Sequence, residues 1–297
     1  YSAGTIEQIG EAEGHTFARV LTQLAHVGLG LAALVLASRF DYHHFRSRPV
    51  LYGLAGLAAV LLVLVLVFGI EVKGARRWLP VLGQTIQPSD FAKLALVALL
   101  AVKLSENQAE LQGLMRGFFP PLALAFAFAG LVVLERDIGT PIVMCATALF
   151  MVFVAGSRLR HLLLGAGSVL VLFVGYVLAT PHAISRITAF MRPWEYREKA
   201  GFQLLQALYA IARGGLWGRG AGAGQGKLDY IFAAESDFVF AVWGEEMGLA
   251  GALVVVVLFA AFVVLAFRIA IKARDTLGML LALGIGCVIG LQALLNL

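Results

Sequence analysis

Long apolar runs separated by short polar connections dominate the hydropathy pattern of this chain. A helix needs about 20 apolar residues to cross the hydrocarbon core of a bilayer. The pattern therefore predicts eight membrane-spanning helices, at residues 16–38, 49–70, 87–104, 114–134, 139–156, 161–180, 238–267 and 276–297. The segment 139–156 is short, and 238–267 is longer than one crossing requires, so we expect the latter to tilt or to project.

Composition agrees with this pattern. Of the 297 residues, 60% are hydrophobic and only 14% are charged, and the mean hydropathy is +0.88. A soluble domain cannot bury that much apolar surface. We predict an all-α, polytopic integral membrane protein whose single domain covers residues 1–297 and is trimmed at both ends. Cys145 and Cys287 lie within apolar runs, which indicates buried thiols rather than a disulfide or a metal site.

The distribution of basic residues predicts the orientation. The formal net charge of +5 does not indicate nucleic-acid binding, because the charges fall in connections between apolar segments. One alternate set of connections holds ten basic residues, namely Arg39, Arg46, Arg48, Lys103, Arg116, Arg158, Arg160, Arg268, Lys272 and Arg274. The short connections of the other set hold four, namely Lys73, Arg76, Arg77 and Arg136. The positive-inside rule places the first set in the cytoplasm.

One connection, 181–237, is far longer than the others and falls on the outer side in this topology. Connections of that length are usually functional or disordered. It contains an apolar helical pattern, GFQLLQALYAIAR, followed by a glycine-rich run at 214–226. No strand precedes the glycines, so a dinucleotide or P-loop fingerprint is not met, and we interpret the run as a lid or hinge.

The stretch KGARRWLPVLGQTIQPSDFAKLAL, residues 73–96, has two interpretations. Pro88 and Asp90 suit a first helical turn, and Lys93 lies one turn further on the face of Asp90. The stretch is either an interfacial anchor, with Lys93 extending to the headgroups, or an anion site for a pyrophosphate. Its candidate ligands are Arg76, Arg77, Trp78 and Lys93.

Acidic residues at two further places also allow a structural or a functional role. Asp137, in LERDIGTP, is either part of a solvated turn at a helix boundary or a functional charge held close to the bilayer. Asp237, in ESDFVFAVWGEE, is either a helix N-cap or a reactive carboxylate. Glu245 and Glu246 lie about 12–14 Å deeper at 1.5 Å per residue, too far for a catalytic pair with Asp237. They are expected to pair with a basic group or to line a cavity.

Several of these motifs together resemble the SEDS family (shape, elongation, division and sporulation), whose members include FtsW, RodA and SpoVE. KGARRW…QPSDFAKLAL is similar to the family's GARRW…QPSE-x-AKL, and ERDIGT to its [EQ]-P-D-[LF]-G-T turn. GFQLLQALYAIARGGLWGRG, ESDFVFAVWGEEMGLAG and QALLNL resemble three further motifs, in the family's order and spacing. Arg136 departs from the family pattern, which has proline there.

The resemblance implies ten transmembrane helices, of which this chain would hold the second to the ninth, with one large extracytoplasmic loop. It implies a peptidoglycan glycosyltransferase that polymerises lipid II at the outer face of the bacterial cytoplasmic membrane, with a class B penicillin-binding protein as partner. The family's catalytic aspartate maps onto Asp237. The positions implied to bind substrate are Arg76, Arg77, Trp78, Lys93, Asp137, Gln203 and Gln206.

The mechanism expected from this resemblance is a single displacement at an anomeric carbon. Asp237 would accept the proton of the attacking hydroxyl, and the basic residues would stabilise the leaving pyrophosphate. A divalent cation, Mg²⁺ or Mn²⁺, is compatible with that chemistry, although the sequence indicates no metal ligands. Two alternatives remain open: a flippase for the lipid-linked precursor, and a non-catalytic scaffold for a transpeptidase.

Overall fold

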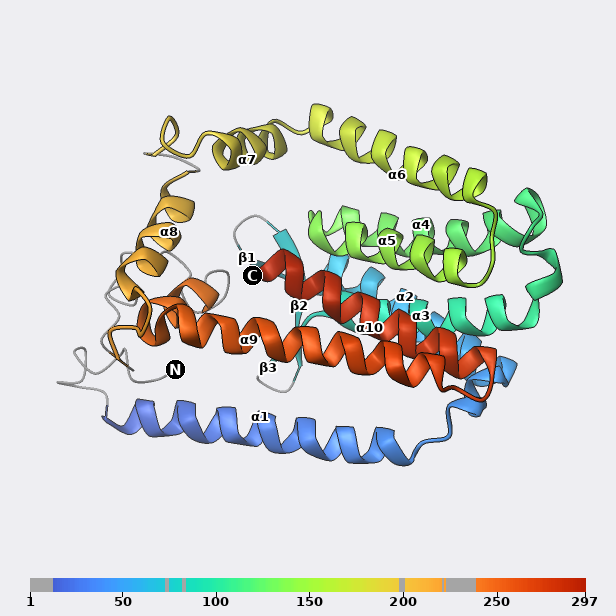
Figure 1. The fold of residues 1–297 in the computed structure, drawn as a ribbon, viewed down its shortest axis with the longest axis horizontal. Helices are drawn as coiled ribbons and strands as arrows, with labels where there is room; N and C mark the ends of the chain where they lie inside the picture. The colour runs from blue at the N-terminus through green and yellow to red at the C-terminus, as the bar shows by residue number, and fades with distance from the viewer. Residues whose placement is uncertain (1–12, 73–74, 82–83, 198–200, 221, 223–238) are drawn as a thin grey trace. The chain divides into compact units, whose positions relative to one another are not determined.

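Helices occupy all eight predicted apolar segments in the computed structural model, which describes residues 13–72, 75–81, 84–197, 201–220, 222 and 239–297 (Figure 1). They are α1 (Glu13–Arg39), α2 (Arg48–Phe68), α3 (Pro88–Glu106), α4 (Phe119–Leu134), α5 (Gly139–Val154), α6 (Leu159–Ala179), α9 (Val239–Ile271) and α10 (Thr276–Asn296). Five helical stretches within the described residues are long and apolar enough to cross a membrane. The predicted all-α, multi-pass architecture is confirmed, and the count of eight crossings stays a prediction.

One compact unit comprises mainly residues 42–174 and 259–295, and α3 is its central helix. Thirteen of the 19 residues of α3 are buried, so most of its surface packs against neighbouring elements. Close packing brings α10 against α3 and α5: a Cβ added at Gly284 would lie 2.5 Å from Val97 Cγ1 and 2.9 Å from Met151 Sδ. Only a residue without a side chain allows this approach.

A small antiparallel sheet joins α2 to α3, and the apolar pattern did not predict it. Its strands are β1 (Ile70–Val72), β2 (Ala75–Val81) and β3 (Gln84–Ile86), in the order β1-β2-β3. Ile70 pairs with Trp78, and Leu79 pairs with Ile86. The sheet lies at the end of the unit where α2 ends and α3 begins, and it carries the predicted arginines.

At the other end of this unit, short helical turns and one partly buried carboxylate connect the helices. The turns are η2 (Tyr42–Arg46), η3 (Gln108–Glu110) and the π-helical turn η4 (Leu114–Phe118). Asp275 caps α10 by accepting a hydrogen bond from the Gly278 N–H at 3.1 Å. It also accepts hydrogen bonds from Tyr42 Oη at 2.9 Å and Arg46 Nη2 at 3.1 Å, which ties η2 to the start of α10.

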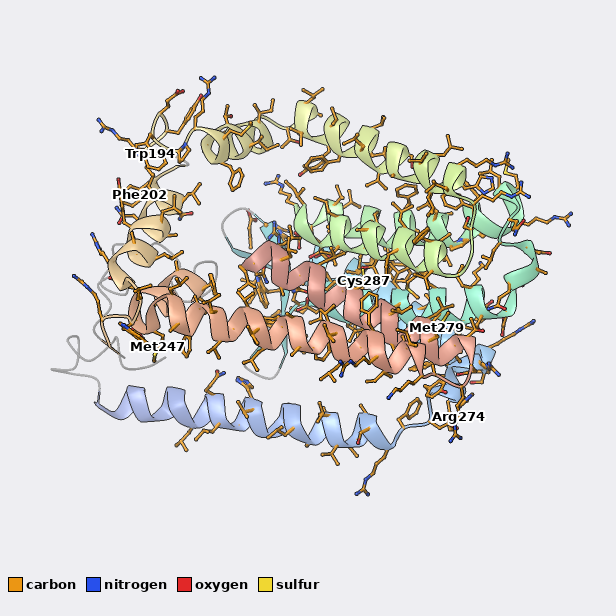
Figure 2. All side chains as sticks on the ribbon, viewed as in Figure 1. Trp194, Phe202, Met247, Arg274, Met279 and Cys287 are labelled. Atoms are coloured by element: carbon orange, nitrogen blue, oxygen red, sulfur yellow. The ribbon has the colours of Figure 1, made fainter. Side chains whose placement is uncertain are left out.

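The second compact unit contains the described part of the long connection and the first half of α9. The connection forms α7 (Pro181–Met191) and α8 (Phe202–Gly214), so the helix predicted from GFQLLQALYAIAR is confirmed. Four small buried residues, Ala207, Ala210, Ala241 and Val242, form the contact of α8 with α9. Trp194, between α7 and α8, and Phe202, the first residue of α8, are exposed; both are labelled in Figure 2.

A break in α9 at Gly248 distinguishes the structure from the continuous helix assumed in the sequence analysis. Gly248 has φ 66° and ψ −170°, a conformation that side chains other than glycine rarely adopt. Backbone groups of the segment after α8 form hydrogen bonds with backbone groups of α9 on both sides of this break. The N–H groups of Arg219 and Gly220 donate to the carbonyls of Glu245 and Glu246, at 3.1 and 3.0 Å. Those of Leu249 and Ala250 donate to Gly215 and Leu216, at 2.9 and 3.1 Å.

Candidate functional site

Strand β2 separates the two arginines that the sequence places side by side. The pairing of β1 with β2 is irregular here: Ile70 and Glu71 pair with Trp78 and Arg76, which leaves Arg77 as the extra residue of β2. Arg76 is exposed and forms an ion pair with Glu71, with 3.5 Å between Arg76 Nε and Glu71 Oε2. Arg77 turns to the connection between α4 and α5, where its Nη2 donates to the carbonyl oxygen of Arg136. Trp78 is half-buried.

One N–H group of the Arg77 guanidinium can still donate a hydrogen bond. Its Nε is buried and has no hydrogen-bond partner among the described residues. A buried donor without a partner costs about 1–3 kcal/mol, so such a group favours any oxygen that can reach it. A guanidinium presents its N–H groups in a fixed fork that matches the oxygens of a phosphate or a carboxylate.

Lys93 forms a second polar centre in the same unit. Its side chain is only 4% exposed, so it does not extend to the membrane surface as the anchor interpretation required. Its ammonium lies 2.8 Å from Asp90 Oδ1, one helical turn away, which confirms the shared face predicted from the spacing. It also donates to Oε1 of Gln292, near the end of α10. A buried ammonium is thereby fixed in position by an acid and an amide.

Asp137 serves the start of α5. It is 7% exposed, and its Oδ1 accepts hydrogen bonds from the N–H groups of Gly139 at 3.1 Å and Thr140 at 3.4 Å. Its Oδ2 accepts from the Thr140 hydroxyl at 2.8 Å. A carboxylate in this place satisfies free N–H groups at a helix start and interacts favourably with the helix dipole. Asp137 thus marks a helix boundary, as the structural interpretation states, but its side chain is buried and not solvated as that interpretation assumed. The substrate-binding role stays a prediction.

Glu135 is the most unusual ionisable group of this turn. It is 1% exposed, and neither of its carboxyl oxygens has a hydrogen-bond partner among the described residues. Burial, reinforced by the negative charge of Asp137, raises the pKa of Glu135 from 4.5 to about 8, although the charge of Arg77 acts in the opposite direction. At neutral pH the Glu135 side chain is therefore mostly a neutral acid, and it does not itself neutralise the charge of Arg77.

Arg136, between these two acids, has a left-handed backbone with φ 60°, the only such residue other than glycine in the described part of the chain. Proline is restricted to φ near −65° and cannot adopt this conformation. The family's usual proline could therefore not adopt the backbone conformation that Arg136 has here.

The remaining predicted residues lie in the other compact unit or outside the described residues. Gln203 and Gln206 are half-buried on α8. Glu245 and Glu246 are buried in α9, where their carbonyls accept the hydrogen bonds described above. Asp237 lies outside the described residues, so its predicted role as proton acceptor is not tested by the geometry.

The metal expectation finds no support among the described side chains. They contain no cluster of three or more histidine, cysteine, aspartate or glutamate residues that would hold a metal ion. Asp137 already uses both oxygens on α5, and Glu135 retains its proton at neutral pH, so these two carboxyls do not fit a divalent cation.

Two residues of this site were not among the sequence candidates. Gln292 belongs to QALLNL, and a lone amide inside an apolar run is a signal that it bonds another helix. Glu135 lies beside the predicted Asp137, but nothing in the sequence distinguishes a buried acid from an exposed one in so short a turn.

Comparison with known proteins identifies relatives over nearly the whole chain. The family model of FtsW, RodA and SpoVE, described as cell cycle proteins, matches residues 1–297. The chain is 38% identical over 276 residues to stage V sporulation protein E of Bacillus subtilis strain 168, covering 92% of this chain and 75% of that protein. It is 37% identical over 269 residues to the probable peptidoglycan glycosyltransferase FtsW of Geobacter sp. strain M18. This match covers 90% of this chain and 73% of that protein.

Solved structures show the same fold. A chain of a peptidoglycan synthase complex that coordinates polymerization and crosslinking has a TM-score of 0.76 and 25% identity, covering 99% of this chain and 82% of that one. A mutant of the rod shape determining protein RodA from Thermus thermophilus has a TM-score of 0.61 and 26% identity. This match covers 92% of this chain and 73% of that one.

Proposed function

The chain belongs to the FtsW, RodA and SpoVE family of cell cycle proteins, and from this membership we propose that it is a peptidoglycan glycosyltransferase of the bacterial cell wall. The observation that carries the proposal is its 37% identity, over 90% of its length, to a protein named as a probable peptidoglycan glycosyltransferase. The proposed substrate is lipid II, polymerised into glycan strands at the outer face of the cytoplasmic membrane. The proposed partner is a class B penicillin-binding protein.

The location of the chain suits a lipid-linked substrate. The described helices place many leucine and valine side chains on their outer surfaces, as expected of a multi-pass membrane protein. A polyprenyl tail can remain in the hydrocarbon region while the pyrophosphate and sugars reach the polar end of the helices. The sheet, the turn at Glu135 and the start of α3 lie at such an end.

Arg77 and Lys93 are the cations best placed to bind a diphosphate in this proposal. Arg77 keeps one buried N–H without a partner among the described residues, and Lys93 is held by Asp90 and Gln292. Because Glu135 is mostly neutral at pH 7, the charge of Arg77 is available to an anion. Arg76, Trp78, Gln203 and Gln206 complete the proposed substrate contacts, and Arg76 would have to exchange Glu71 for the substrate.

The proposed reaction joins two sugars in one step. A hydroxyl of the acceptor attacks the anomeric carbon of the donor, a new C–O bond forms, and the bond from that carbon to the diphosphate breaks. Asp237 accepts the hydroxyl proton, a role worth about 10²–10⁴-fold in rate for a well-placed base. The diphosphate leaves with the electron pair, and fixed cations stabilise its charge. A single displacement inverts the anomeric centre.

The test is polymerisation of labelled lipid II by the purified full-length protein, with and without its partner transpeptidase. Asp237→Asn should lower the rate at least 100-fold, and Glu235→Gln, which removes a neighbouring carboxylate, should retain it. Both variants must show wild-type thermal stability. Glycan strands made by Asp237→Asn at the wild-type rate would refute the assignment of the base. Movement of labelled lipid II across vesicles without any polymer would favour the flippase alternative.

A further inference from the structure

A pocket of about 600 Å³ opens at the end of the larger compact unit where α6 begins. It lies between the connection that leads from α3 to α4 and the first turn of α6. Its walls include Gln112, Leu114, Arg158, Arg160, His161 and Leu164. None of the sequence motifs and none of the proposed catalytic residues belongs to this pocket.

The polar part of the pocket is suited to an anion. Arg158 and Arg160 are both exposed, and no acidic residue is among the lining side chains. Arg158 Nη2 donates to Gln112 Oε1 at 3.3 Å, a long bond that a stronger acceptor can replace. The third polar group, His161, is only 3% exposed, and its Nδ1 has no hydrogen-bond partner among the described residues. Burying a polar ring without a partner has a cost that a structural role alone does not explain.

The apolar part of the pocket consists of exposed leucine side chains. Leu114 and Leu164 line it, with exposed fractions of 43% and 61%. Met115, Phe119 and Leu163 continue this surface, with exposed fractions of 75%, 58% and 66%. An occupant that matches both parts carries a negative charge at one end and hydrocarbon at the other.

The pocket is separate from the candidate active site. Helix α4 begins beside it, directly after η4, and ends at the turn that holds Glu135. At 1.5 Å per residue, the 16 residues of α4 separate the two ends by about 24 Å. The apolar stretch Leu114–Leu134, which includes α4, is long enough to cross a membrane, so we expect the pocket and the Arg77 site at opposite surfaces of it. The excess of basic residues predicts that the pocket is on the cytoplasmic side.

We infer that this pocket binds the phosphate of an anionic phospholipid, with Arg158 and Arg160 on the headgroup and Leu114 and Leu164 on the acyl chains. The inference does not depend on the proposed glycosyltransferase activity. It adds a lipid-binding site at the surface opposite to the one where the substrate is proposed to react.

The experiment is native mass spectrometry of the full-length protein with phosphatidylglycerol, phosphatidylcholine or inorganic phosphate. The test variant is Arg158→Gln/Arg160→Gln. The matched control, Arg268→Gln/Lys272→Gln, removes the same charge from exposed positions of the same predicted cytoplasmic side. We expect phosphatidylglycerol retention to fall at least tenfold more in the test variant than in the control, with little retention of phosphatidylcholine by any form.

Two further arms separate the possible outcomes. Leu164→Ala should weaken retention of phosphatidylglycerol but not of inorganic phosphate, because it removes only the apolar wall. If the double variant fails to fold, as judged by thermal stability without lipid, Arg160→Gln alone replaces it. Equal losses in test and control variants would show diffuse surface attraction and overturn the site. Retention of inorganic phosphate as strong as that of phosphatidylglycerol, or equal retention of both phospholipids, would overturn the lipid assignment.

Discussion

Replacement of Glu135 by glutamine tests the unusual state of this buried carboxyl. The raised pKa means that the folded protein keeps a proton which the unfolded chain loses between 4.5 and about 8. The stability that this proton provides is complete below pH 4.5, declines as the pH rises through this interval, and is absent above the folded pKa. Glutamine is neutral at every pH and has nearly the size of the protonated acid.

The magnitude follows from the two pKa values. At pH 7, about 2.5 pH units above the ordinary value of 4.5, each unit corresponds to about 1.4 kcal/mol. Ionisation in the unfolded chain therefore lowers the free energy of unfolding of the wild type by about 3 kcal/mol at pH 7, relative to its value in acid. Glu135→Gln escapes this loss, so it should be about 3 kcal/mol more stable than the wild type at pH 7 and similar to it below pH 4.5.

The measurement is denaturant unfolding of both proteins in the same detergent from pH 4.5 to 9. Glu106→Gln, which changes an exposed acid of the same unit, is the control and should follow the wild-type curve. If wild type and Glu135→Gln show parallel pH profiles, the carboxyl does not titrate in this interval and the reasoning is wrong. On the proposed function, the wild-type KM for lipid II should also rise above pH 8, and that of Glu135→Gln should not.

Three further sets of substitutions test the backbone and the buried ammonium. Arg136→Gly should stabilise by about 1 kcal/mol, because it relieves the left-handed conformation, whereas Arg136→Pro should cost roughly 3 kcal/mol in thermal unfolding. Gly218→Ala and Gly220→Ala share a positive φ, but a Cβ at Gly218 would lie 2.1 Å from a carbonyl oxygen and one at Gly220 meets nothing within 4 Å. Only Gly218→Ala should abolish polymerisation, because only its Cβ would collide with the backbone. Equal losses of polymerisation in the two variants would refute this argument. Replacing Gln292 by leucine should destabilise by about 1.5–3 kcal/mol while Lys93 is present, and far less in Lys93→Met; a double-mutant cycle without coupling would contradict the contact.

The apolar pattern predicted the helices well because hydrocarbon thickness sets their length. Each of the eight predicted segments agrees with a helix to within a few residues. The sheet at 70–86 escaped prediction because its strands are only three to seven residues long and have no clear alternation. The break at Gly248 also escaped, because glycine is common in membrane helices and its conformation depends on the segment after α8.

The candidate site was predicted only in part. Helical spacing correctly placed Lys93 with Asp90, since residues three apart share a helix face. Adjacent numbering grouped Arg76 with Arg77, but an unforeseen strand directs them to different partners. Burial of Lys93 and Glu135, and the contact of Lys93 with Gln292, depend on tertiary packing between distant parts of the chain. No local pattern contains that information.

The backbone bonds of α9 have a consequence for the stretch that carries Asp237. Gly220, before this stretch, is bonded to Glu246, and α9 begins after it at Val239, so both of its flanks are held by the first part of α9, residues 239–247. The segment 215–220 is also bonded to Leu249 and Ala250, so a rotation of α9 about Gly248 would break hydrogen bonds on one side of it. The kink therefore resists bending, and the two points that anchor the stretch with Asp237 keep a fixed separation.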